Sequence, residues 1–193
     1  TSERKLTLYN SIADALWHSD MMEAISYADS AYVLSSQVDN KEQTLLALTN
    51  KGVGEYSLGK YKEAEEFFNK AISFSVKHQL DSKAHIYYLS LLKKQGNYNE
   101  IINITRQMLS DNEAIQSADP DYLISSSDAF VEMGNSLEAK KYLEPVLNSK
   151  RFQKDKELIA RAYIVLAKLL TLNSQYDSAQ QVLDEALVVY DGL

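Results

Sequence analysis

The sequence predicts an all-α protein, a solenoid of about five helix-turn-helix pairs. Two observations support this prediction. Small and large apolar residues recur at helical spacing in paired segments, and the same pair returns along the chain every 37 to 40 residues. The composition agrees, because two prolines and six glycines in 193 residues suit long helices joined by short turns.

The first pair is predicted over residues 4–37. Its first helix, residues 4–17, gathers apolar side chains on one face, and a break at residues 18–20 separates it from a second helix over residues 21–36. The second helix carries small residues at regular offsets: Ala24, Ala28 and Ala31. This pair reads as a degenerate copy of the next one.

The second pair, residues 40–78, has the clearest pattern. Gly59 can close its first helix, because glycine adopts the left-handed backbone conformation without a Cβ clash. Gly52 on the first helix and Ala64 on the second allow the two backbones to approach closely, while Phe68 fills the space beside them. Close antiparallel packing of two helices requires this mixture of sizes.

This second pair resembles the tetratricopeptide repeat, a helix-turn-helix motif of 34 residues. The characteristic positions of the motif are held here by Leu48, Gly52, Gly59, Tyr61, Ala64, Phe68 and Ala71. Lys51 departs from the usual Leu, and Val76 from the usual Pro. The resemblance implies a right-handed superhelix in which the first helices of the pairs line a concave groove.

Three further pairs are predicted over residues 81–112, 119–150 and 154–191, so we expect a single domain over residues 1–193. In the first two of these pairs, Gly96 and Gly134 occupy the turn position of Gly59. In the last pair, the turn is expected over residues 173–175, and Tyr176, Ala179, Leu183 and Ala186 match Tyr61, Ala64, Phe68 and Ala71.

Both prolines of the chain lie in the fourth pair. Asp119–Pro120 predicts a helix start, because Asp caps a helix and Pro at the first helical position loses no needed N–H. Pro145, in contrast, falls inside the second helix of the pair and should kink it or end its regular part early.

The last predicted helix has a wide apolar stripe. One partner helix would cover Leu183, Ala186 and Tyr190 but leave Val182 and Val189 partly bare. Because repeat arrays end in a helix with a polar outer face, we expect the chain to be a fragment of a longer protein that continues past residue 193.

Charge and composition exclude several classes of function. The net charge of −7 argues against nucleic-acid binding, which needs a basic surface. No run of 18 apolar residues could insert into a membrane, and without cysteine there is no disulfide or thiolate chemistry. Neither absence decides the compartment. We expect either a periplasmic sensor region, which is slightly favoured, or a cytoplasmic protein.

The resemblance implies that a protein or peptide ligand binds in the groove formed by the first helices. The groove residues that it implies are Tyr9, Trp17, Thr49, Tyr56, Ile86, Lys93, Asp128, Arg161 and Lys168, with Ile124 and Ile164 beside them. Aromatic and apolar anchors framed by charges suit an amphipathic helix or a peptide. The alternative is that several of these residues, above all the isoleucines and the aromatic side chains, belong to the ordinary core.

Catalytic, cofactor and metal sites are not predicted. Three dispersed histidines, His18, His78 and His85, lack the spacing of metal ligands. Ser126 and Ser127 have no nearby histidine or glycine-rich elbow for nucleophilic catalysis. Some tetratricopeptide proteins grip a peptide C-terminus with Lys and Asn; no Asn stands at the corresponding positions here, which include Tyr9, Thr49, Ile86, Ile124 and Ile164.

The long repeat period resembles that of the tetratricopeptide sensor regions of bacterial signalling proteins, of the histidine kinase and response regulator type. The function expected from this resemblance is a non-catalytic sensing or docking module. A free-standing scaffold or assembly adaptor is the alternative, and self-association through the ends of the array is a further one.

Overall fold

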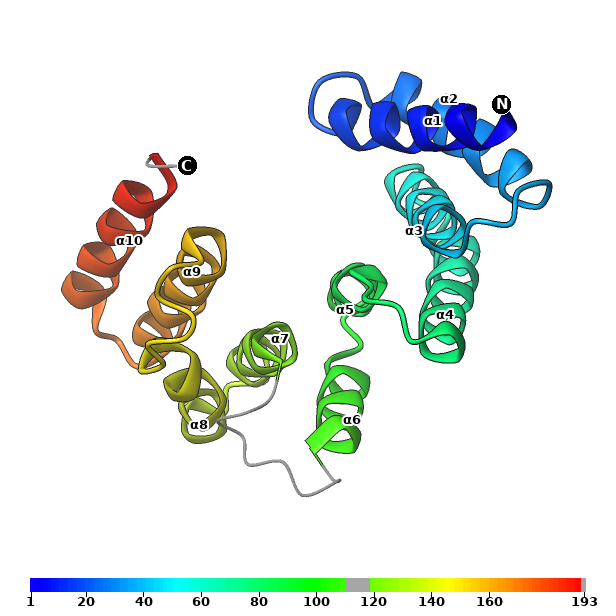
Figure 1. The fold of residues 1–193 in the computed structure, drawn as a ribbon. Coiled ribbons are helices and arrows are strands. Elements are labelled where there is room, and N and C mark those ends of the chain that lie inside the picture. Colours follow the sequence, from blue (N-terminus) through cyan, green and yellow to red (C-terminus); the bar gives the residue numbers. More distant parts are fainter. Residues whose placement is uncertain (110–118, 192–193) are drawn as a thin grey trace. The chain divides into compact units, whose positions relative to one another are not determined.

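The computed structural model describes residues 1–109 and 119–191, and within them the chain is helical without a β-strand (Figure 1). This confirms the predicted fold class. The chain divides into two compact units, residues 1–91 and 92–193. The helices are α1 (Ser2–Leu16), α2 (Met21–Ser35), α3 (Lys41–Ser57), α4 (Tyr61–His78), α5 (Ala84–Lys94), α6 (Tyr98–Leu109), α7 (Pro120–Glu132), α8 (Ser136–Leu147), α9 (Lys156–Leu172) and α10 (Tyr176–Asp191).

Helices that follow each other in sequence pack together within each unit. In unit 1, α1 packs on α2 and α3 on α4, and α1 also contacts α3. In unit 2, α7 packs on α8 and α9 on α10, and α7 also contacts α9. The first helices of successive pairs therefore lie side by side within a unit, as the resemblance implied. The boundary between the units falls within α5, and the end of the predicted repeat 81–112 lies outside the described residues.

The predicted turns and caps are confirmed. Gly59, Gly96 and Gly134 have φ angles of 75°, 71° and 75°, a region that costs a glycine little. The first helix of the second pair begins after Asn40, whose side chain accepts a hydrogen bond from the Gln43 N–H. Pro120 stands at the first position of α7 behind its Asp119 cap.

Close packing of α3 against α4 depends on Gly52. A Cβ at this position would lie 2.6 Å from Cε1 of Phe68, inside contact distance. Phe68, Ala64 and Ala71 are fully buried. The two backbones thus approach with the ring of Phe68 against the bare Cα of Gly52, as the sequence predicts.

Lys51, which departs from the repeat pattern, has a structural role. Its ammonium lies 2.5 Å from the carboxylate of Glu55 and 2.6 Å from that of Asp29 on α2. Glu55 is itself buried, and its carboxylate also pairs with the ammonium of Lys60 at 3.4 Å. The apolar residue usual at this position is therefore replaced by an ion-paired one that ties α3 to α2.

The small-residue positions predicted for the core are buried in every pair. These residues are Ala24, Ala28, Ala31, Ala64, Ala71, Ala179 and Ala186, and Ile101 and Ala139 are buried at the equivalent positions of the third and fourth pairs. The exception is Leu183, which was matched to the buried Phe68 but is 39% exposed. Phe68 is covered by α5, where Tyr87 stacks on its ring, whereas Leu183 has no such covering helix among the described residues.

The apolar stripe of α10 is only partly covered. Ala186 is buried and Val182 and Val189 are half-buried, but Leu187 and Val188 are 60% and 74% exposed. The covered face is therefore centred on Ala179 and Ala186, seven residues apart, and Leu183 lies at its edge. The expectation that the partner helix covers Leu183 is wrong, and the side chain of Tyr190 lies outside the described residues.

Pro145 does not end α8 early. The helix continues to Leu147, and the N–H of Asn148 still donates to the carbonyl oxygen of Glu144 at 2.9 Å. Pro145 stands in the last turn, where the missing N–H removes one helical hydrogen bond and few helical residues follow.

Across residues 1–109 and 119–191, none of the helices combines the length and the apolar composition that crossing a membrane requires.

Candidate binding groove

A groove with a volume of about 740 Å3 opens on unit 1. Four segments form it: the end of α1, the middle of α3, the connection between α4 and α5, and the start of α5. Its lining consists of Asp14, Trp17, His18, Glu42, Leu45, Leu46, Thr49, Asn50, Gln79, Leu80, Asp81, Ser82, Lys83 and Tyr87. The first helices α1, α3 and α5 supply half of these residues, and the others come from the turn after α1 and from the α4–α5 connection.

The wall between α4 and α5 is shaped by a left-handed residue. Gln79 ends α4 with a φ angle of 53°, and the Leu80 N–H then donates back to the carbonyl oxygen of Ser75 at 2.9 Å. This turn packs Leu80 against a core cluster that includes Leu45 and Leu48. The polar residues that follow Leu80 are thereby held along the edge of the groove.

Trp17 and Thr49 are the two predicted site residues that line this groove. Trp17 is half-buried at the end of α1, and Thr49 is buried on α3 with its hydroxyl donating to the carbonyl oxygen of Leu45 at 2.9 Å. The hydroxyl of Thr49 is therefore already hydrogen-bonded within α3, while Trp17 offers an aromatic ring to a ligand. Large half-exposed aromatic residues supply much of the energy of protein interfaces.

Asp14 brings a charge to the groove. Desolvation by the surrounding side chains raises the pKa of its carboxyl, while hydrogen bonding by Asn50 and the positive charge of Lys83 act in the opposite direction. A carboxylate that is partly removed from water interacts more strongly with a cation than one in bulk solvent.

Two buried asparagines, of which Asn50 lines the groove, were not predicted from the sequence. Asn10 on α1 is fully buried, and its amide donates to the backbone oxygen and to the side-chain oxygen of Gln43 at 3.0 Å each. Asn50 on α3 is buried and lines the groove, with its amide 3.5 Å from the carbonyl oxygen of Asn10. Their separation of 40 residues, the spacing of Ala24 and Ala64, is the signal that could have found them.

The other predicted residues of unit 1 are placed elsewhere. Tyr9 packs its ring against Tyr27 of α2, with centroids 5.8 Å apart. Tyr56 packs against the ring of Tyr61 at 5.9 Å, next to the cluster around Phe68. Ile86 is half-buried on α5 beside Tyr87, and it is Tyr87 that lines the groove.

The four predicted charged residues of unit 2 are joined in ion pairs. Lys93 of α5 and Lys168 of α9 both pair with the carboxylate of Asp128 on α7, Lys168 at 2.8 Å. Lys168 also reaches Glu132 at 2.9 Å. About two turns earlier on both helices, Arg161 of α9 pairs with Asp121 of α7 at 2.6 Å.

These ion pairs give the predicted groove residues of unit 2 a structural role. Asp128 is only 5% exposed, so its two lysines neutralise a buried carboxylate between helices. The sequence analysis names the two lysines, Arg161 and Asp128 as groove residues, and it does not name their partners Asp121 and Glu132. Their spacing on α7, seven and four residues from Asp128, was a signal that the three acids share one helix face.

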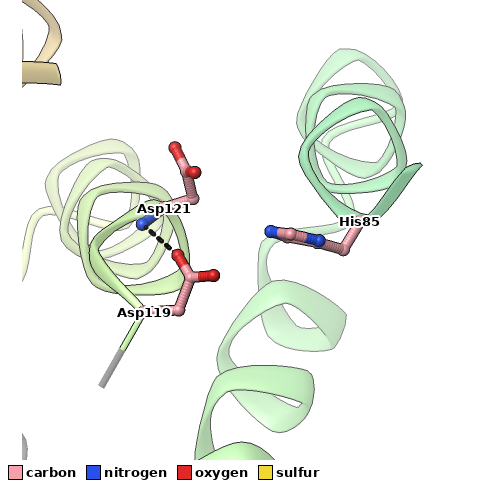
Figure 2. Close-up of side chains that lie close together, drawn as sticks. All are labelled: His85, Asp119 and Asp121. Atoms are coloured by element: carbon pink, nitrogen blue, oxygen red, sulfur yellow. Dashed lines mark hydrogen bonds between the residues drawn. The ribbon is translucent and has the colours of Figure 1, made fainter. Parts of the chain in front are cut away.

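The start of α7 shows how the acids near it are held. The backbone N–H of Asp121 donates to the Asp119 carboxylate at 2.9 Å, a hydrogen bond drawn in Figure 2. Burial, together with the charges of Asp119 and Asp121, raises the pKa of the nearby Tyr122 to about 12. Asp119 thus serves as the predicted helix cap.

Comparison with known proteins agrees with this geometry. The tetratricopeptide repeat family matches residues 4–75. The chain has the tetratricopeptide repeat fold. No curated protein matches the chain.

Solved structures extend the likeness to the whole length. A putative kinesin light chain from Podosopora anserina, with nearly identical tetratricopeptide-like repeats, is 15% identical, with a TM-score of 0.65 over 98% of this chain and 96% of that one. MamA, from residue 41 to its end, of Desulfovibrio magneticus RS-1 is 14% identical, with a TM-score of 0.58 over 97% and 96%. BtubC from P. vanneervenii is 12% identical, with a TM-score of 0.55 over 99% and 89%.

Tetratricopeptide repeats generally mediate protein–protein interaction, and the fold is typically a non-catalytic module. Two hydroxyls of this chain that could have suggested a nucleophile are committed to packing. Ser126 is fully buried and donates to the Thr105 hydroxyl at 2.7 Å, and Ser127, also buried, donates to the carbonyl oxygen of Ala139 at 2.8 Å.

A second hollow of about 750 Å3 runs along α8. Its lining comes from that helix and the turn directly after it, including Leu137, Lys140, Glu144 and Pro145. A single helix supplies no opposing wall, so this hollow would bury little of a ligand. The groove of unit 1, with walls from four segments, is the better candidate in this tetratricopeptide fold.

Proposed function

We propose that this chain is a non-catalytic protein- or peptide-binding module and that the groove of unit 1 receives its ligand. The supporting observation is the combination of walls from four segments with aromatic, apolar and charged side chains that converge on one hollow. Ligand sites are concave and combine apolar surface with polar groups that fix the orientation of the ligand. Peptide grooves that accept helices or extended segments share this character.

The energetic argument begins with the apolar lining. Leu46 and Leu80 are half-buried, and Tyr87 is 38% exposed, so each can lose further apolar area to a ligand. Burial of apolar area contributes about 25 cal/mol per Å2. Part of this gain offsets the loss of ligand freedom on binding, which favours a ligand that contacts several of these side chains at once.

Selection from a random-sequence peptide library with the full chain tests this proposal. Bound peptides are then titrated against the wild type, Trp17→Ala and Leu137→Ala. Leu137 is the matched control because it is 79% exposed and lines the other hollow, on α8. We expect Trp17→Ala to weaken binding by about tenfold or more, as removal of a central aromatic anchor does.

The Leu137→Ala variant should bind as the wild type does. A library that yields no peptide, or peptides whose affinity falls with Leu137→Ala and not with Trp17→Ala, would show that the groove of unit 1 is not the binding surface.

Two settings for such a module are proposed. One is the sensing or docking region of a bacterial signal-transduction protein, periplasmic or cytoplasmic, and the other is a free-standing scaffold or assembly adaptor. Sequencing the source gene on both sides of this chain separates them. A kinase-like or DNA-binding region in the same reading frame would favour the sensor, and a short polar capping helix followed by a stop codon would favour the scaffold.

Self-association is a further candidate, supported by the exposed Leu187 and Val188 on α10. Light scattering over a range of concentrations tests it with the double variant Leu187→Lys, Val188→Lys. If the face joins copies of the chain, the mass of the wild type rises with concentration and that of the variant stays monomeric. If the wild type is monomeric throughout, this candidate fails.

A further inference from the structure

The charges around the groove of unit 1 are predominantly acidic. Asp14 on α1, Glu42 on α3 and Asp81 in the α4–α5 connection are exposed lining residues, and Lys83 is the one Lys or Arg among them. His18 is also exposed at the rim of the groove. The groove therefore presents three carboxylates against one ammonium.

The acids come from three separate segments, and apolar side chains lie between them. Trp17 stands one turn after Asp14 on α1, and Leu45 and Leu46 stand one turn after Glu42 on α3. The carboxylates of Asp14 and Glu42 are thus each followed one turn later by an apolar residue, while Asp81 lies in the α4–α5 connection. A ligand that enters the groove meets an apolar surface and a negative charge within a few ångströms of each other.

Lys83 is the internal counter-charge of this groove. Its positive charge acts on the Asp14 carboxyl, although its own side chain is exposed at the edge. An exposed lysine is loosely held, because an ion pair in solvent contributes little and long side chains lose entropy when fixed. A cation from a ligand can therefore compete with Lys83 for Asp14.

We propose that the groove of unit 1 selects a peptide segment that carries an Arg or Lys beside an apolar anchor, with the cation placed against Asp14 and the anchor against Trp17 and Tyr87. The inference rests on the proposed function and adds the chemistry of the ligand. Charge complementarity of this type gives specificity and faster association more than raw affinity.

The test uses the library selection with the full chain and reads the composition of the bound peptides. The expected result is enrichment of Arg and Lys next to an aromatic or branched apolar residue. The best peptide is then titrated by fluorescence anisotropy against Asp14→Asn, Lys83→Gln and Glu144→Gln. Glu144 is the matched control, since it is an exposed acid that lines the hollow on α8 and receives the same change.

Asp14→Asn should weaken binding by about two- to fivefold, which is the range for a solvent-accessible ion pair. Lys83→Gln should tighten it by a similar factor, because the competing cation is gone, and Glu144→Gln should leave it unchanged. Replacing the basic residue of the peptide by Glu should weaken its binding to the wild type more than its binding to Asp14→Asn. Thermal unfolding followed by circular dichroism verifies that each variant is folded.

The outcomes separate the two proposals. Peptides that bind through Trp17 without basic enrichment, or with acidic residues whose binding depends on Lys83, overturn the inference and leave the proposed function in place. Equal effects of Asp14→Asn and Glu144→Gln also overturn it. A library that yields no peptide overturns the proposed function, and the inference with it.

Discussion

Lys168 on α9 donates to the buried carboxylate of Asp128 on α7 across 2.8 Å, and the two residues are 40 positions apart in sequence. Lys93 at the end of α5 pairs with the same carboxylate. Within unit 2, one buried acid on α7 thus connects α9 with the last residues of α5. The spacing of 40 is the repeat period, so Asp128 and Lys168 occupy equivalent positions in successive repeats.

Asp128→Ala should lower the stability of the protein. Two charge-assisted contacts are lost, but both lysines are partly exposed and can return to water, so we expect a cost of about 1–3 kcal/mol, below that of breaking a fully buried pair. Urea unfolding measures the difference. Glu144→Ala on α8 is the control, since its pair with Lys140 is exposed and its loss should cost less than about 0.5 kcal/mol. Equal stability of the two variants would contradict a structural role for Asp128.

Lys168 predicts a dependence on pH. Desolvation lowers the pKa of its ammonium, but hydrogen bonds to Asp128 and Glu132 and the charges of both acids outweigh it and raise the pKa above the ordinary 10.5. The folded state then holds the proton more tightly than the unfolded state, so the contribution is complete below pH 10.5 and disappears as the pH rises through the folded value.

The comparison that measures this effect is between the wild type and Lys168→Met. Their difference in free energy of unfolding should be constant from neutral pH to about 10 and should shrink above 10.5. A difference that grows with pH in this range would show that the ion pairs are not its source.

Gly52 and Gly54 offer a matched pair of substitutions on α3. Gly52→Ala should cost at least about 1 kcal/mol, because the clash with Phe68 exceeds the gain in helix propensity. Gly54→Ala should be neutral or stabilising by up to about 1 kcal/mol, because its Cβ would meet Ile25 at 3.5 Å and Trp17 at 3.7 Å, which are ordinary contacts. Thermal unfolding ranks the two. A Gly52→Ala variant as stable as Gly54→Ala would refute the close approach of α3 and α4.

Glu55 predicts a loss of stability in acid. Burial raises the pKa of its carboxyl, but the hydrogen bond and charge of Lys51, with those of Lys60, outweigh burial and lower the pKa below the ordinary 4.5. The folded state therefore favours the ionised form, and the contribution is present above pH 4.5 and lost as the pH falls through the folded value.

Glu55→Gln should accordingly be less stable than the wild type by about 1–2 kcal/mol at neutral pH. The two proteins should converge as the pH falls below 4.5, which urea unfolding at a series of pH values measures. A difference that does not depend on pH would mean that Glu55 acts by packing alone.

Local signals predicted most of the fold. Gly59, Gly96 and Gly134 predict turns because glycine adopts a positive φ angle at little cost, whatever surrounds it. The small residues predict the positions at which helices pack closely. Leu183 was misplaced because its burial depends on a further helix, which the repeat pattern assumes and the described residues do not supply. An apolar residue in a repeat pattern shows that burial is favourable at that position, but the side chain is buried only if another helix packs against it.

The candidate site was harder to predict for the same reason. Trp17 and Thr49 line the groove of unit 1, but Tyr9 faces α2 because a shift of one residue along a helix moves a side chain by about 100°. Asp14, Asp81 and Tyr87 come from segments whose meeting depends on the turn at Gln79. The sequence does not predict a turn at Gln79, since glutamine rarely adopts a left-handed conformation.

Trp17 permits the most direct measurement of the central claim, because it is the only tryptophan of the chain and it lines the groove. A labelled peptide from the library is titrated into the protein while anisotropy of the label and emission of Trp17 are followed together. We predict that the emission changes and saturates at the same peptide concentration as the anisotropy. Complete binding by anisotropy with unchanged Trp17 emission would place the ligand elsewhere and contradict the account.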